Sequence, residues 1–191
     1  EGIDVFGGGS VSNVGQELSI STSGFGTSAI SVAESGSLNL SGVNVSTTGG
    51  ATNRPSVTGS YGLNVQGEDA RADFTAGSIL TTGSHAIGAF VLGGQLSLAD
   101  TVIRTTAPAP VRNNGLIFGA YGANVGVGGR LIVEGGSIQT EGDYGIGLRS
   151  TGSGTTLSAK DLNISTLGNT SYGIKGSAGA RADVSGIAIF T

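Results

Sequence analysis

The stretch "SIQTEGDYGIG" (residues 137–147) contains two short patterns, Ile-x-Thr with a glycine two residues later and Tyr-Gly-apolar, and no strongly reactive side chain. The first pattern recurs throughout the chain. Its copies begin at Ile20, Val45, Ile79, Ile103, Ile138, Ile164 and Ile189, which are separated by 25, 34, 24, 35, 26 and 25 residues. In five copies a glycine follows the threonine by two residues: Gly24, Gly49, Gly83, Gly142 and Gly168. A period of this length is typical of solenoid proteins.

Two further patterns recur in phase with the first. The pattern of any residue, Gly or Ala, then an apolar residue has copies that begin at Glu1, Ser28, Tyr61, His85, Tyr121, Tyr144 and Tyr172. Between the two patterns lies an alternating stretch, as in Leu38-Asn39-Leu40 and Leu96-Ser97-Leu98. Alternation with period two predicts strands with one face inside. The first coil fits this alternation poorly, because counting back from Ile20 reaches Asn13 and Gly15.

Three short strands in each coil of roughly 25 residues predict one all-β domain over residues 1–191, a parallel β-helix of about seven coils. A right-handed helix is expected, since strand–connection–parallel strand units strongly prefer that hand. Composition agrees, because 37 glycines disfavour helix interiors. The alternative is a disordered Gly/Ser-rich linker, but seven copies in phase argue against it.

Charge and composition also limit the classes of function. The net charge is −4 and the nine basic residues are scattered, so the basic patch of a nucleic-acid binder is missing. Cysteine is absent, which excludes disulfides and thiolate metal sites. No apolar segment approaches the ~20 residues that a membrane helix needs.

The repeat is interrupted twice, between the Thr-x-Gly turn and the next first strand. The insertions are Gly50–Ser60 and Ala107–Ala120, and they contain all three prolines and one arginine each. We expect two loops on one edge, two coils apart. They form the candidate partner-binding site, with contact residues Asn53, Arg54, Pro55, Pro108, Pro110, Arg112, Asn113 and Asn114. The alternative is that solenoids simply tolerate insertions, because loop closure costs little.

Other features that can carry chemistry have structural explanations. The column from Glu1 to Tyr172 suggests a sugar-stacking strip, but its parity with the inward Ile and Leu residues favours a structural stack. His85 has no second histidine or cysteine to complete a zinc site, and no nucleophile motif accompanies it. The repeated threonines are expected to face inward and bond the turn backbone. No catalytic, cofactor-binding or metal-binding residues are therefore predicted, and no cofactor.

Coils such as "YGIGLRSTGSGTTLSAKDLNISTLG" (144–168) and "YGLNVQGEDARADFTAGSILTTG" (61–83) resemble the repeats of pertactin-like passenger domains of Gram-negative autotransporters, the type V secretion proteins. The resemblance covers the whole chain but rests on structural residues. It implies a right-handed β-helix exposed on the cell surface, carried there by an outer-membrane barrel outside this chain. The Arg-Gly-Asp motif and the serine-protease motif of some members are absent.

The leading hypothesis is a non-enzymatic adhesin or host-factor-binding segment, active in virulence or immune evasion, whose loops contact a host cell-surface protein, serum protein or surface glycan. The protein is expected to be a monomer at the cell surface or secreted. It is also expected to be a fragment of a longer passenger, because both ends fall within a coil. Two alternatives remain open: a polysaccharide-binding or polysaccharide-cleaving β-helix, and an inert spacer that holds a distal tip.

Overall fold

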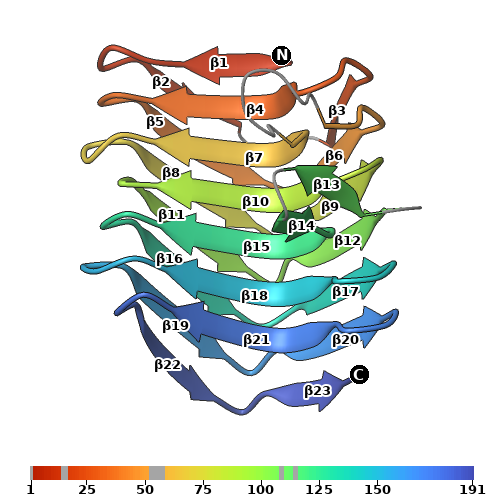
Figure 1. The fold of residues 1–191 in the computed structure, drawn as a ribbon. Helices are drawn as coiled ribbons and strands as arrows, with labels where there is room; N and C mark the ends of the chain where they lie inside the picture. Colours follow the sequence, from red (N-terminus) through yellow and green to blue (C-terminus); the bar gives the residue numbers. More distant parts are fainter. Residues whose placement is uncertain (1, 14–16, 52–58, 108–109, 114–115) are drawn as a thin grey trace.

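The computed structural model describes residues 2–13, 17–51, 59–107, 110–113 and 116–191. They form 23 strands, of which 21 make three parallel seven-stranded sheets. Figure 1 shows the chain crossing the front wall, turning behind it and returning one level lower, which is right-handed winding. The predicted parallel β-helix of seven coils is thus confirmed. Within the described residues, no helix is long and apolar enough to cross a lipid bilayer.

Each sheet takes one strand from every coil. The first wall consists of β1 (Ile3–Val5), β4 (Ser28–Ala33), β7 (Tyr61–Gln66), β10 (Ile87–Leu92), β15 (Tyr121–Gly126), β18 (Ile146–Thr151) and β21 (Tyr172–Ser177). The second wall consists of β2 (Ser10–Ser12), β5 (Ser37–Ser41), β8 (Arg71–Thr75), β11 (Gln95–Ala99), β16 (Arg130–Glu134), β19 (Thr156–Lys160) and β22 (Arg181–Ser185). The third wall consists of β3 (Leu18–Thr22), β6 (Val43–Thr47), β9 (Ser78–Thr82), β12 (Val102–Thr106), β17 (Ser137–Glu141), β20 (Asn163–Leu167) and β23 (Ala188–Phe190). The two remaining strands, β13 (Val111–Asn113) and β14 (Leu116–Phe118), form an antiparallel hairpin.

The repeated apolar residues line one continuous core. In the third wall the register aligns Ile79 with Val45 and Ile103, as the first pattern predicts. The alternating residues of the second wall, such as Leu96 and Leu98, are buried in the same cluster. In the last coil Ala182 and Val184 hold the same register but are exposed, because no described strand stacks beyond β22.

The first coil fits the alternation better than counting from Ile20 predicts. Val11 pairs with Leu38 and packs against the core, so the inward position is Val11 rather than Asn13. Counting fails because the segment between β2 and β3 is longer than the single residue between β5 and β6. The Asn13 side chain instead bonds the backbone of Ser41, with Nδ2 donating to the carbonyl and Oδ1 accepting from the amide, each at 2.8 Å.

Glycines in the first wall leave room for isoleucines of the third wall. A Cβ at Gly62, Gly88, Gly122 or Gly147 would lie 2.2–2.4 Å from the Cγ2 atom of the isoleucine opposite: Ile79, Ile103, Ile138 or Ile164. In the second coil, where Ala29 holds the glycine position, the third-wall residue is Val45. The size of the first-wall residue is therefore coupled to that of the third-wall residue in the same coil, with glycine opposite isoleucine.

The inward threonine column is present, but its hydroxyls are not bonded as expected. Thr47, Thr81 and Thr105 lie in register at zero exposure. The Oγ1 atoms of these three residues, and those of Thr22, Thr140 and Thr166, are buried with no hydrogen-bond partner in the structure. The predicted bonds to the turn backbone are therefore wrong. Neighbouring coils are about 4.8 Å apart, which is too far for one threonine to bond the next.

Candidate functional site

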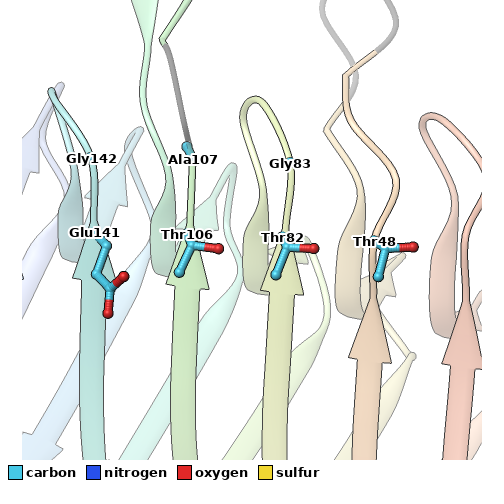
Figure 2. A pocket seen from close by; sticks show the side chains of 7 residues that line it. All are labelled: Thr48, Thr82, Gly83, Thr106, Ala107, Glu141 and Gly142. Carbon is cyan, nitrogen blue, oxygen red and sulfur yellow. The ribbon is translucent and has the colours of Figure 1, made fainter.

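Both insertions leave the same edge, between the third and first walls. In Figure 2 the chain continues into an insertion after Thr48 and after Ala107, while the turn at Gly83 between them is short. Five of the expected contact residues lie outside the described residues: Asn53, Arg54, Pro55, Pro108 and Asn114.

The other three contact residues belong to the second insertion, which is not an irregular loop. Pro110 directly precedes β13, and Arg112 and Asn113 lie within it. Arg112 pairs with Ile117 and is exposed, while Asn113 pairs with Leu116 and is half-buried. The insertion therefore presents a short hairpin, and Figure 1 draws it in front of the first wall, beside β10 and β15.

A groove of about 610 Å³ lies at the roots of the insertions on the third-wall side. We call it the threonine groove; it is lined by Thr48, Thr82, Gly83, Thr106, Ala107, Glu141 and Gly142. Figure 2 shows Thr48, Thr82, Thr106 and Glu141 in a row on successive coils. Glu141 is already engaged, because its Oε1 accepts from Arg104 Nη2 at 2.8 Å and from Gln139 Nε2 at 2.7 Å. The row offers hydroxyls and methyl groups for contact, but no activated nucleophile.

A second groove lies on the outer face of the first wall. Two adjoining pockets of about 270 and 190 Å³ share Phe118, Tyr121 and Arg149. We call them together the aromatic groove; the principal wall residues are Tyr61, Phe90, Tyr121, Arg149, Tyr172 and Lys175. The hairpin contributes Leu116, Ile117 and Phe118. We call the edge between the third and first walls, where both insertions leave the solenoid, the insertion edge. The threonine groove lies on one side of its hairpin and the aromatic groove on the other.

The tyrosine column was expected to share the inward parity of the neighbouring Ile and Leu residues, and for Tyr61 and Tyr121 this expectation is wrong. Tyr61 stacks on Phe90 with ring centroids 4.9 Å apart, and Phe90 lies between the inward residues Ala89 and Val91. Tyr61 and Tyr121 therefore belong to a small cluster separate from the main core. The cause is local, because Gly62 and the next residue, Leu63, both contact the interior. The alternation of inward and outward residues is therefore interrupted at Gly62.

The residues that occupy the predicted column from Glu1 to Tyr172 also differ from the prediction. Tyr61 pairs with Ile87, which pairs with Tyr121, and the alternation continues through Ile146 to Tyr172. His85 and Tyr144 stand two residues before the strand position, with φ of 51° and 59°. The pattern misleads because it matches twice in these coils, and the glycines that face isoleucine are Gly88 and Gly147.

His85 attaches the hairpin to the solenoid. Its Nδ1 lies 2.9 Å from the carbonyl oxygen of Gly119, and its ring meets Phe118 and Tyr121 edge-on at 5.1 and 5.2 Å. Burial lowers the pKa of His85, and the Arg149 charge lowers it further against the opposing bond to Gly119. The imidazole is therefore held neutral, with Nδ1–H as the donor. These contacts give His85 a structural role at the base of the hairpin.

The charges of the aromatic groove are positive although the chain is negative overall. The Arg149 guanidinium lies 5.6 Å from the Tyr121 ring centroid, and its Nη1 donates to Asn124 Oδ1 at 3.2 Å. Lys175 Nζ lies 4.5 Å from the Tyr172 centroid. Neither cation takes part in an ion pair with a described residue. No carboxylate is among the described residues that line the groove.

Burial raises the pKa values of Tyr61 and Tyr121, so both phenols stay protonated. The groove therefore combines neutral aromatic rings with two cations that lack a carboxylate partner.

The second wall has a contrasting outer face. One outward column of this wall carries Arg71, Arg130 and Arg181 on alternate coils. Its shallow pocket of about 300 Å³ lies between Arg130 and Arg181. Arg181 is neutralised by Asp183, with Nε and Oδ2 at 2.9 Å. No aromatic residue lines this pocket.

Comparisons of the chain with protein-family models, with curated proteins and with solved structures give no significant match.

Proposed function

We propose that this chain is a surface-exposed segment of an autotransporter passenger, an adhesin or host-factor binder without enzymatic activity. The repeat resemblance and the parallel β-helix support the passenger assignment. The observation that carries the binding role is the insertion edge, where a structured hairpin stands between two grooves while the opposite turns are short. Insertions on one face of a solenoid commonly form its binding surface.

The arrangement of acids supports binding rather than cleavage. Most glycoside hydrolases use two carboxyl groups that flank the scissile bond. No described carboxylate lines the aromatic groove, and Glu141 of the threonine groove is held by Arg104 and Gln139. Among the described residues, no cluster of three His, Cys, Asp or Glu side chains is suited to a metal ion.

Replacing the insertions by an ordinary turn tests the proposal. The turn Gly168–Ser171 joins a third-wall strand to a first-wall strand that begins with tyrosine, as both insertions do. Residues 50–60 are replaced by Asn-Thr-Ser and residues 107–120 by Gly-Asn-Thr-Ser, so that both edges copy this turn. We expect the β-sheet circular dichroism to persist and binding to host cells or serum proteins to be lost.

A matched variant on the second wall, Arg181→Gln with Asp183→Asn, keeps both insertions and is expected to bind normally. If the replaced protein is folded and binds as well as the wild type, the insertion edge is not the contact region. If the unmodified chain binds no host cell or serum protein at all, the segment is a spacer and the proposed function is wrong.

A further inference from the structure

We infer that the aromatic groove binds an acidic oligosaccharide that lies along the solenoid axis. This inference rests on the proposed binding function and names the ligand class of one of its two grooves. The carbohydrate would carry carboxylate or sulfate groups, whose shared chemistry is a fixed negative charge on a sugar ring.

The aromatic content of the groove is the first support. The chain has four tyrosines, and all four line this groove: Tyr61, Tyr121, Tyr144 and Tyr172. Phe90 and Phe118 join them, so most of the chain's aromatic rings gather on one outer face. Rings that offer an apolar body and a polar tip suit a pyranose, which has an apolar C–H face and a rim of hydroxyls.

The spacing of the rings is the second support. The register places a tyrosine on every second coil of the first wall, with Ile87 and Ile146 between. Two coils correspond to about 9.6 Å at the spacing of neighbouring strands. This is close to the length of a disaccharide in an extended chain. From Tyr61 to Tyr172 the groove crosses four rung spacings, or about 19 Å, which accommodates a short oligosaccharide.

The charges identify the oligosaccharide as acidic. Arg149 and Lys175 stand on adjacent coils in one outward column, in register with Asn124. Both cations are held over tyrosine rings rather than against carboxylates. An anionic sugar substituent would therefore meet donors whose charge no described acid neutralises. A neutral glycan would use the rings but leave these two cations without a partner.

The walls of the groove distinguish a glycan from other polyanions. A single-stranded nucleic acid needs a run of cations that follows its phosphate backbone. The described residues that line the groove include only two cations, Arg149 and Lys175. The polar groups that remain are amides and hydroxyls, such as Asn124 and Thr170, which suit sugar hydroxyls.

Tyrosine fluorescence provides a selective assay, because the chain has no tryptophan and all its tyrosines line the groove. The unmodified chain is titrated with hexasaccharides of hyaluronan, which carry carboxylates, and of heparan sulfate, which also carry sulfates. Chitohexaose is the neutral probe of equal length. We expect saturable changes with one or both acidic probes, at an affinity at least about tenfold higher than for chitohexaose.

Charge-removing variants test the assignment to this groove. Arg149→Gln with Lys175→Gln is expected to weaken binding of the acidic probe at least about tenfold and to abolish the preference over chitohexaose. The matched pair Arg130→Gln with Arg181→Gln, on the second wall, removes the same charge and is expected to bind as the wild type does. Circular dichroism checks that each variant is folded.

Several results would overturn the inference. They are no saturable change with either acidic probe, equal affinity for chitohexaose, an unaffected groove variant, or tighter competition by a single-stranded oligonucleotide. Failure of the inference is distinguishable from failure of the proposed function. If replacing the insertions abolishes cell binding while no hexasaccharide binds, the binding edge stands and the ligand class is wrong. If the hexasaccharide binds while cell binding survives the replacement, the ligand class stands and the proposed contact region is wrong.

Discussion

The interior of the coils and the outer face of the first wall are built by the same strands but follow different rules. Inside, each coil repeats the last, with isoleucine above isoleucine and threonine above threonine. Outside, the first wall carries Ser31, Asn64, Phe90, Asn124 and Arg149 at one register position of successive coils. The repeat is strict where side chains must stack in a closed space and relaxed where they meet solvent.

This difference shows where to look for function in a solenoid. Interior columns are constrained by packing, so their residues describe the fold. Outer positions and turn insertions are free of that constraint, and here they bring together a hairpin, tyrosines and two cations.

The largest expected effect comes from breaking the interior with Gly88→Val. The new Cβ would lie 2.4 Å from Ile103 Cγ2 and 2.5 Å from the carbonyl oxygen of Gly122, so overpacking should cost about 3 kcal/mol. Urea unfolding followed by circular dichroism measures the loss. Gly176→Ala, in the same wall with no atom within 4 Å of the new Cβ, is the control and should change little. Unchanged stability of Gly88→Val would disprove the coupling between glycine and isoleucine.

A smaller effect of opposite sign is expected from Thr105→Val. The Thr105 hydroxyl is buried without a partner, and replacing it by a methyl group removes that desolvation penalty, which should stabilise the fold by about 1 kcal/mol. Thermal or urea unfolding measures the gain. Thr75→Val, at an exposed outward position of β8, should be nearly neutral. A clear destabilisation by Thr105→Val would mean that the hydroxyl is satisfied after all.

A weaker effect on the free energy of unfolding, which depends on pH, is expected from the buried His85 side chain. Because the pKa of His85 is lowered in the folded state, the folded protein binds fewer protons than the unfolded chain. The stabilisation is complete above the ordinary value of about 6.5 and is lost as the pH falls from there toward the lowered pKa.

Urea midpoints at pH 7 and pH 5 measure this loss, with His85→Gln as the control. The wild type should lose more stability between the two pH values than the variant does. Equal losses would show that His85 does not titrate in this window.

The smallest effect is expected on the second wall. Arg181→Gln removes an ion pair whose side chains are 73% and 63% exposed, so stability should change by no more than about 0.5 kcal/mol. Binding to host cells should not change either. A loss of binding would move the functional face from the first wall to the second.

The repeat allowed the fold to be predicted because interior columns leave a periodic signal. The Ile and Thr positions and the Leu96 and Leu98 alternation all lie as expected. The chain segment before Ile20 was misaligned, since one longer connection shifts every residue counted back across it. The second insertion was expected to be a loop, and its hairpin has no repeat partner from which to predict it.

The aromatic groove was not predicted, although its residues were visible. Parity placed Tyr61 with Leu63 inside, but Gly62 and Leu63 both contact the interior, so the alternation shifts by one residue and Tyr61 lies outside the main core. Phe90 lies between the apolar residues Ala89 and Val91, and Arg149 and Lys175 each follow an apolar residue, Leu148 or Ile174, so partial alternation was the available signal. Their proximity to Phe118 depends on how the hairpin folds back, which no periodicity encodes.

The alternation of residues in the first wall has a consequence for how the gene of such a solenoid could lengthen by duplication. Tyrosines at Tyr61, Tyr121 and Tyr172 coincide with arginines at Arg71, Arg130 and Arg181, and both insertions precede coils of this kind. The tetrapeptide Ala-Arg-Ala-Asp occurs at 70–73 and again at 180–183. Duplication of one coil in the gene would set tyrosine beside tyrosine and arginine beside arginine, whereas duplication of a pair would preserve both alternations. The outer surface of this solenoid therefore repeats every two coils, whereas its core repeats every coil.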